Sequence, residues 1–134
     1  MASGPAEKRG KYLIDTSALY PMLLEGVTLD PNKFVISKLT EYEIGNVLWK
    51  ENKQKKLKDP EKVALLFADA IRGLERADIK SVADVLVLAI DRNLTFYDAS
   101  YCFIAETEHF RLITQDEKLR KKTKGAIGIS DILS

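Results

Sequence analysis

Residues 12–17 read Tyr12-Leu-Ile-Asp-Thr-Ser17, a short apolar run that stops abruptly at an aspartate. Such a run, bounded by polar residues, is typical of a strand buried inside a sheet. A second stretch follows the same plan, because Leu112-Ile113 leads through two polar residues to Asp116. Both stretches therefore predict strands that carry a carboxylate to their C-terminal end.

Strand and helix patterns alternate along the rest of the chain. Apolar runs predict further strands at 34–36 and 127–129, and a short edge strand at 78–80. Helical spacing of apolar residues predicts helices over 18–24, from 40 to just before 59, and over 60–74, 82–90 and 95–108, with a lysine-rich helix after 116. This alternation predicts a single α/β domain over residues 11–134, a three-layer α/β/α sandwich with a mostly parallel central sheet. Residues 1–10 are predicted to be a flexible arm or a remnant of cloning.

Composition places the chain among ordinary soluble proteins of one domain. It has 134 residues, of which 46% are hydrophobic and 31% charged. The single Cys102 rules out an internal disulfide and suits a reducing compartment, and the one histidine leaves little for zinc or Ser–His–Asp chemistry. No apolar run approaches the ~20 residues that cross a membrane, and the N-terminus has no signal-peptide pattern. We therefore expect a cytoplasmic protein.

Acidic residues stand where an α/β sheet gathers its ligands. In open α/β sheets, ligands bind beyond the carboxyl ends of the strands, where Asp15 and Asp116 are expected. Glu43 and Asp98 stand near the starts of two predicted helices, which gather at the same end. A carboxylate cluster repels itself unless a cation is present, and Mg²⁺ or Mn²⁺ prefers such oxygen ligands. The chemistry that fits is metal-assisted attack of water on a phosphodiester.

Each acid also has a purely structural interpretation. The pairs Thr40–Glu43 and Thr95–Asp98 have capping-box spacing, and Asp116 could cap the helix that follows it. Only the aspartate that ends the first strand lacks an equally obvious capping partner. Spacing alone does not bring the four acids together.

Four segments, in order, are similar to motifs of a known family. They are Leu13-Ile-Asp-Thr-Ser-Ala-Leu19, Leu39-Thr-Glu-Tyr-Glu-Ile-Gly-Asn-Val-Leu-Trp49, Leu94-Thr-Phe-Tyr-Asp-Ala-Ser-Tyr101 and Leu112-Ile-Thr-Gln-Asp-Glu-Lys-Leu119. One such motif alone is weakly specific, but together they span nearly the whole chain after Lys11. The chain thus resembles the PIN-domain family, and within it the toxin ribonucleases of prokaryotic VapBC toxin–antitoxin pairs.

The resemblance implies one catalytic pocket that binds Mg²⁺ or Mn²⁺. Its metal-binding and catalytic residues would be Asp15, Glu43, Asp98 and Asp116. Glu43 matches the motif rather than Glu41, because it directly precedes the Ile-Gly-Asn-Val run. Thr114 would lie beside the pocket and form hydrogen bonds there, and weaker polar candidates for its rim are Thr16, Ser17 and Asn46. The implied activity is endoribonuclease cleavage of RNA, and the implied protein partners are a VapB-type antitoxin and a second copy of the chain.

Basic and aromatic residues near these motifs allow two interpretations. An acidic pocket needs flanking cations to hold an RNA backbone, and the predicted RNA-binding residues are Lys118, Arg120, Lys121 and Lys122. The run from Lys50 to Lys58 is more typical of a solvated helix end. The aromatics, which are expected to be core or dimer contacts rather than base-stacking residues, are Tyr42, Trp49, Tyr97 and Tyr101. Cys102 is expected in the core, and His109 as a surface helix cap.

Two other functions compete with the toxin interpretation. A housekeeping PIN nuclease would process ribosomal or other RNA, although chains of that kind often carry an accessory domain. A phospho-receiver module would also gather acids around Mg²⁺, but it needs an accepting aspartate on a central strand. Asp15 comes too early in the chain for that role.

Overall fold

The computed structural model describes residues 10–133, with side chains up to residue 132, and its centre is a parallel sheet. The strands are β1 (Tyr12–Ile14), β2 (Phe34–Ser37), β3 (Glu75–Ala77) and β4 (Arg111–Ile113). They lie in the order β3-β2-β1-β4, and every pairing between them is parallel. The predicted parallel α/β sheet is confirmed.

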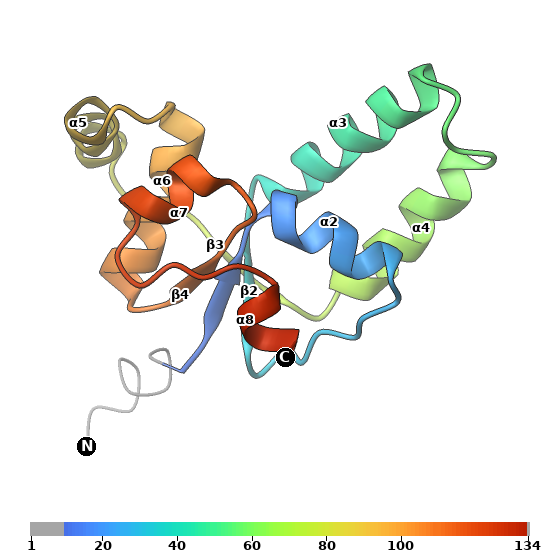
Figure 1. The fold of residues 1–134 in the computed structure, drawn as a ribbon, viewed down its shortest axis with the longest axis horizontal. Coiled ribbons are helices and arrows are strands. Elements are labelled where there is room, and N and C mark those ends of the chain that lie inside the picture. The colour runs from blue at the N-terminus through green and yellow to red at the C-terminus, as the bar shows by residue number, and fades with distance from the viewer. Residues whose placement is uncertain (1–9, 134) are drawn as a thin grey trace.

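Helices cover both faces of this sheet. They are α2 (Thr16–Leu24), α3 (Thr40–Lys53), α4 (Pro60–Ile71), α5 (Val82–Arg92), α6 (Phe96–Glu108), α7 (Glu117–Lys122) and α8 (Ser130–Leu133). Helices α5, α6 and α7 lie on one side of the sheet, and α2, α3 and α4 on the other, which gives the predicted three layers (Figure 1). Between residues 10 and 133, no helix combines the length and the apolarity needed to cross a bilayer.

Successive strand residues face opposite cores, because side chains alternate along a strand. On one face Leu13, Val35 and Leu112 pack with α5 and α6. On the other face Ile14, Ile36 and Ile113 pack with α2, α3 and α4. All six are fully buried. A short strand buried on both faces appears in the sequence as the uninterrupted apolar run seen at residues 12–14.

Two predicted strands are wrong in place or in kind. The edge strand expected at 78–80 lies at Glu75–Ala77, and the carboxylate of Asp78 accepts a hydrogen bond from the Ile79 amide where the chain leaves the sheet. An edge strand exposes its side chains, so polar residues can form it. The strand expected at 127–129 is a single bridge between Ile113 and Ile127. The next amide, that of Gly128, donates to a side chain rather than to the sheet.

Helix α3 is shorter than its sequence pattern predicted. Helix α3 ends at Lys53, and Lys55 adopts a left-handed φ of 58°, so the last lysines of the basic run lie in a turn. Pro60 begins α4 in its first turn, and Asp59 caps that helix by accepting from the Lys62 amide. The basic run therefore marks a helix-to-helix connection.

The chain order of the strands fixes where a ligand crevice forms. From β1 the chain builds outward through β2 to β3, and it then returns to place β4 on the other side of β1. Such a reversal opens a crevice at the carboxyl ends of the strands beside it. Asp15 directly follows β1 and Asp116 follows β4 by three residues, so both stand at this crevice.

Candidate active site

Four helix starts carry the four acids to the crevice. Asp15 is the N-cap of α2, Asp116 is the N-cap of α7, and Glu43 and Asp98 lie in the first turns of α3 and α6. Electrostatic repulsion links Asp15 to Glu43, and links Asp98 to both Glu43 and Asp116. The four predicted residues therefore lie within electrostatic range of one another. The positive end of each helix dipole offsets part of their mutual repulsion.

Asp15 is the most tightly held of the four acids. Its side chain is 6% exposed, and one carboxylate oxygen accepts hydrogen bonds from the Ser17 hydroxyl at 2.7 Å and the Ala18 amide at 3.2 Å. The other oxygen accepts from the Thr114 hydroxyl at 2.5 Å. Burial raises the pKa of Asp15 from 3.8 to about 6, with a smaller contribution from Glu43, although these hydrogen bonds oppose the rise. The carboxylate is thus costly to ionise without a nearby cation.

Thr114 connects the acids that follow the two central strands. This fully buried side chain donates to Asp15, and its oxygen accepts from the Asp116 amide at 3.0 Å. Ser17 lies 3.2 Å from the same hydroxyl and accepts from the Gln115 amide at 2.9 Å. The loop after β4 is therefore tied to the loop after β1, as a residue positioning the pocket would require.

Glu43 is held by side chains from two other helices. One of its oxygens accepts from the Thr16 hydroxyl at 3.0 Å and from the Tyr101 phenol at 2.5 Å. Burial, together with the charge of Glu43, raises the pKa of Tyr101 well above its usual range, so the phenol stays a proton donor. The site role of Tyr101 was missed in the sequence. Its spacing of three residues from Asp98, which puts both on one face of α6, was the available signal.

Asp98 lies at the more open side of the group. Burial and the charges of Asp116 and Glu43 raise the pKa of Asp98, whereas Thr95 and Lys118 oppose the rise. The Thr95 hydroxyl also accepts from the Asp98 amide at 3.1 Å and so caps α6. Lys118 is therefore near enough to Asp98 to affect its ionisation.

The capping interpretations have different outcomes for different acids. The Thr40 hydroxyl accepts from the Ser37 amide, and the N-cap of α3 is Leu39, so the capping box expected for Glu43 is absent from α3. Thr95 and Asp116 do cap their helices, as that interpretation predicted. Asp15, which seemed to lack a capping partner, caps α2. A cap and a ligand site are thus compatible, because both use a carboxylate at a helix N-terminus.

The predicted RNA-binding residues occupy different environments. The Lys122 ammonium donates to the carbonyl of Arg92 at 2.6 Å, which fastens α7 to the end of α5. Arg120 is half-buried, with its guanidinium beside Gly128. Lys118 and Lys121 are exposed. The RNA-binding prediction therefore rests most directly on these two, since the other two have structural contacts.

A pocket of about 410 Å³ opens beside the acids, and its lining residues are Leu39, Tyr42, Glu43, Asn46 and Tyr97. The aromatics were expected to be core or dimer contacts. Tyr42, Trp49 and Tyr97 are exposed and so lie outside the core, where a role as dimer contacts stays a prediction, and Tyr101 is buried. Trp49 does not line this pocket; the ammonium of Lys53 lies 4.8 Å from its ring centroid.

Cys102 is buried as expected. His109 forms the C-cap of α6 with a left-handed φ of 62°, also as expected.

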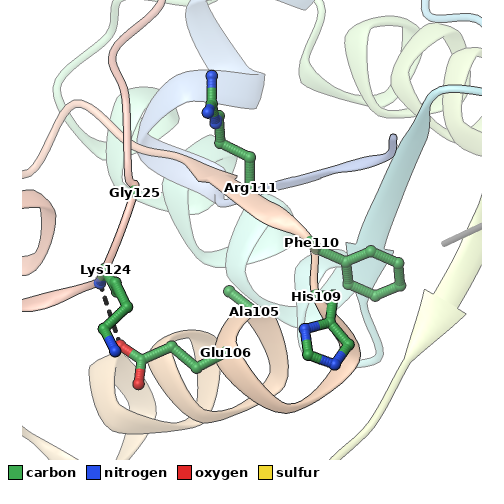
Figure 2. Close-up of a pocket in the computed structure, with 7 residues that line it drawn as sticks. All are labelled: Ala105, Glu106, His109, Phe110, Arg111, Lys124 and Gly125. Carbon is green, nitrogen blue, oxygen red and sulfur yellow. Dashed lines mark hydrogen bonds between the residues drawn. The ribbon is translucent and has the colours of Figure 1, made fainter. Parts of the chain in front are cut away.

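Another pocket, of about 470 Å³, lies at the other end of β4 (Figure 2). His109 and Arg111 contribute to its wall from the start of that strand, and Lys124 from the loop after α7. The Lys124 amide donates to the Glu106 carboxylate at 3.0 Å, which Figure 2 marks with a dashed line. None of the four acids lines it, so the chemistry of the acidic group does not extend there.

The comparison with protein families agrees with this geometry. Residues 12–125 match the family described as PIN domain. The chain therefore belongs to the PIN domain family, and the phospho-receiver interpretation is wrong.

Within that family the chain is of the VapC type. It is 37% identical over 125 residues to Exonuclease VapC9 of Pyrobaculum aerophilum, with 92% of this chain and 93% of that protein covered. It is 26% identical over 125 residues to Ribonuclease VapC3 of the same organism, with 84% and 94% covered. The crystal structure of PAE2754 from Pyrobaculum aerophilum superposes with a TM-score of 0.84 at 36% identity, covering 91% of this chain and 85% of that one.

Proposed function

We propose that this protein is a nuclease that hydrolyses RNA phosphodiester bonds with the help of Mg²⁺ or Mn²⁺. The observation that carries the proposal is the convergence of Asp15, Glu43, Asp98 and Asp116 at the strand ends of a PIN-domain fold. The relatives named as an exonuclease and a ribonuclease support the same chemistry.

The residues present fit a divalent cation. Carboxylate and water oxygens are ligands that Mg²⁺ and Mn²⁺ prefer, and a buried aspartate with a raised pKa is stabilised in its charged form by a nearby positive charge. Within residues 10–133, no three Asp, Glu, His or Cys side chains lie close enough to ligate one ion together. Mg²⁺ commonly binds through one or two carboxylates and keeps several waters. The four acids would therefore hold the ion partly through water.

Side chains around the acids would orient the metal ligands, the attacking water and the RNA. The bound metal would supply charge stabilisation at the scissile phosphate. Thr114 and Ser17 fix the direction of the Asp15 carboxylate, and Thr16 and Tyr101 fix that of Glu43. Asp98, which has a raised pKa and less burial than Asp15, is the acid best placed to orient a water or accept its proton. The exposed Lys118, whose charge acts on Asp98, would hold a flanking phosphate.

Metal dependence is tested by incubating the protein with labelled RNA in Mg²⁺, in Mn²⁺ and in EDTA. Cleavage in either metal, its loss in EDTA and its recovery when metal is added back would support the proposal. Equal cleavage in EDTA would overturn the metal requirement. Absence of cleavage in every condition, for a folded protein freed of any copurified inhibitor, would overturn the activity itself.

The mode of cleavage needs its own substrate. The motif resemblance favours internal cutting, whereas one relative is named an exonuclease. A circular single-stranded RNA has no ends, so only an endonuclease can linearise it. We expect linear product from the circle. Degradation of linear RNA with the circle left intact would assign an exonuclease instead.

We further propose that the protein is the toxin of a VapBC pair, active in the cytoplasm and inhibited by a VapB-type antitoxin. A small neighbouring gene for a DNA-binding protein would support this, particularly if its product abolishes cleavage when added. Lack of such a gene, together with specific trimming of a ribosomal RNA precursor, would favour the housekeeping alternative.

A further inference from the structure

The pocket beside the acids lies between two helix starts of the same design. An exposed tyrosine directly precedes an acid in each: Tyr42 before Glu43 in α3, and Tyr97 before Asp98 in α6. The two side chains are 80% and 61% exposed, and both line the pocket. Neighbouring residues on a helix point about 100° apart, so each ring flanks its acid rather than covering it.

From this arrangement we infer that Tyr42 and Tyr97 form a seat for one unpaired nucleobase next to the scissile phosphate. The inference rests on the proposed function and specifies its substrate as single-stranded nucleic acid. Glu43 belongs both to the pocket wall and to the acidic group, so a nucleotide whose phosphate reaches the acids carries its base to this pocket. Its volume of about 410 Å³ falls within the roughly 300–1,000 Å³ typical of small-ligand sites.

The lining has the chemistry that proteins use to bind bases. Tyrosine rings stack on any base, because every base has a π-face. The exposed Asn46 places an amide, both donor and acceptor, in the same pocket and can pair with a base edge. Leu39 adds an apolar contact. The lining residues of the pocket include no cation, so the phosphate is held elsewhere, and the exposed Lys118, whose charge acts on Asp98, is the candidate.

A seated base cannot remain paired or stacked in a duplex. The enzyme therefore selects single strands, loops or frayed ends, where a base is free to leave the stack. Because stacking tolerates every base, selection among bases falls to Asn46. Asn46→Ala should narrow the difference in affinity between RNAs that differ in the seated base.

Equilibrium binding tests the seat without relying on turnover. A short single-stranded RNA carrying 2-aminopurine is titrated against protein with Asp98→Asn, which keeps the RNA intact, and fluorescence reports base stacking. In this background Tyr42→Ala and Tyr97→Ala should each raise Kd roughly 10-fold. Tyr42→Phe and Tyr97→Phe keep the ring and should stay within about 2-fold. The matched control is Trp49→Ala, an exposed aromatic of α3 outside the pocket, which should bind as the parent does.

A second titration replaces the 2-aminopurine nucleotide by an abasic one and follows binding by the fluorescence anisotropy of a dye on the end of the RNA. This abasic RNA should bind the tyrosine and alanine forms alike. Unchanged Kd for both alanine variants would overturn the seat, as would phenylalanine variants that bind as weakly as the alanine ones. Loss of a dimer in light scattering, with RNA affinity unchanged, would assign the tyrosines to a protein interface. A failure of the proposed function is distinguishable from a failure of the seat. It would appear as a lack of metal-dependent cleavage by the unmodified protein, whatever the binding titrations give.

Discussion

At the scale of single residues, Asp15 carries a charge that opposes folding in the absence of metal. Its pKa is about 6 in the folded protein and 3.8 in a free chain. A raised folded-state pKa means that the acid's stabilising contribution is complete below the unfolded value and is lost as pH rises through the folded one. Between pH 4.5 and 7.5 that loss is about 2 kcal/mol.

We therefore expect Asp15→Asn to stabilise the metal-free protein at pH 7.5 relative to the unmodified chain. Its advantage should shrink by about 2 kcal/mol at pH 4.5, because asparagine does not titrate. Urea unfolding in EDTA at the two pH values measures this difference. An advantage that is absent at pH 7.5, or equal at both pH values, would show that burial of the charge has little thermodynamic effect.

Tyr101 is a positioning residue, because it acts on Glu43 rather than on the substrate. Tyr101→Phe removes a hydrogen bond to a carboxylate, an interaction worth about 1.5–3 kcal/mol. We expect kcat to fall about 10-fold and the half-saturating Mg²⁺ concentration to rise, with KM for RNA nearly unchanged. Tyr20→Phe is the control, since the Tyr20 ring packs against Phe67 rather than against Glu43. A Mg²⁺ titration identical to that of the unmodified protein would limit Tyr101 to core packing.

At the scale of elements, one ion pair fastens the C-terminal ends of three helices to one another. The Arg92 guanidinium, from the end of α5, donates to both oxygens of Glu106 in α6, at 2.6 and 2.9 Å, and to the carbonyl of Lys122 in α7 at 2.8 Å. Burial alone would raise the pKa of Glu106, but hydrogen bonds from Arg92 and the Lys124 amide outweigh it and lower that pKa.

Glu106→Gln should lower the free energy of unfolding at pH 7 by about 2 kcal/mol, because it weakens a bidentate, charge-assisted contact. A lowered folded-state pKa stabilises above the unfolded value of 4.5 and loses that contribution as pH falls. The acid limb of the stability curve should thus be shallower in Glu106→Gln. Denaturant unfolding from pH 7 to 3 tests this, with the exposed Glu61→Gln as control. The same loss of stability between pH 7 and pH 3 in all three proteins would contradict this role of Glu106.

The sequence predicted the acids of the site but not the contacts between helices that hold them. All four acids were recognisable by type and by position at strand or helix ends. The hydrogen bonds of Thr16 and Tyr101 to Glu43 join three different helices, and no periodicity along the chain encodes such contacts. The capping role of Asp15, which accepts a hydrogen bond from the Ala18 amide, was likewise missed.

At the scale of the whole molecule, burial decides which strands a sequence reveals. Strands β1, β2 and β4 are apolar, because both faces are covered, and each was predicted within one residue of its bounds. Strand β3 lies at the sheet edge, where Arg76 pairs with Glu41 at 3.0 Å, so its polar sequence gave no strand signal. The strand order, which creates the crevice, was not predicted, because it depends on contacts between distant segments.

Helix α5 presents an apolar face that its own fold leaves uncovered. Its exposed large apolar residues are Val82, Leu86, Val87 and Ile90. Contiguous patches of this kind are uncommon on monomers, and the family resemblance implies a homodimer. We predict that light scattering gives a dimer for the unmodified protein and a monomer for Ile90→Lys. Leu65→Lys, on α4, is the matched control. A monomeric unmodified protein would contradict the dimer, and a dimeric Ile90→Lys would exclude this face.

The central claim is that four acids from four helix starts act as one site, and single substitutions test it most directly. We would measure initial rates of RNA cleavage in Mg²⁺ for Asp15→Asn, Glu43→Gln, Asp98→Asn and Asp116→Asn, with the exposed acid variant Asp84→Asn as control. The four-acid site predicts a loss of at least about 100-fold for each of the four variants and an unchanged rate for Asp84→Asn. Near-normal cleavage by any one of the four, in a folded protein, would contradict a site that needs all of them.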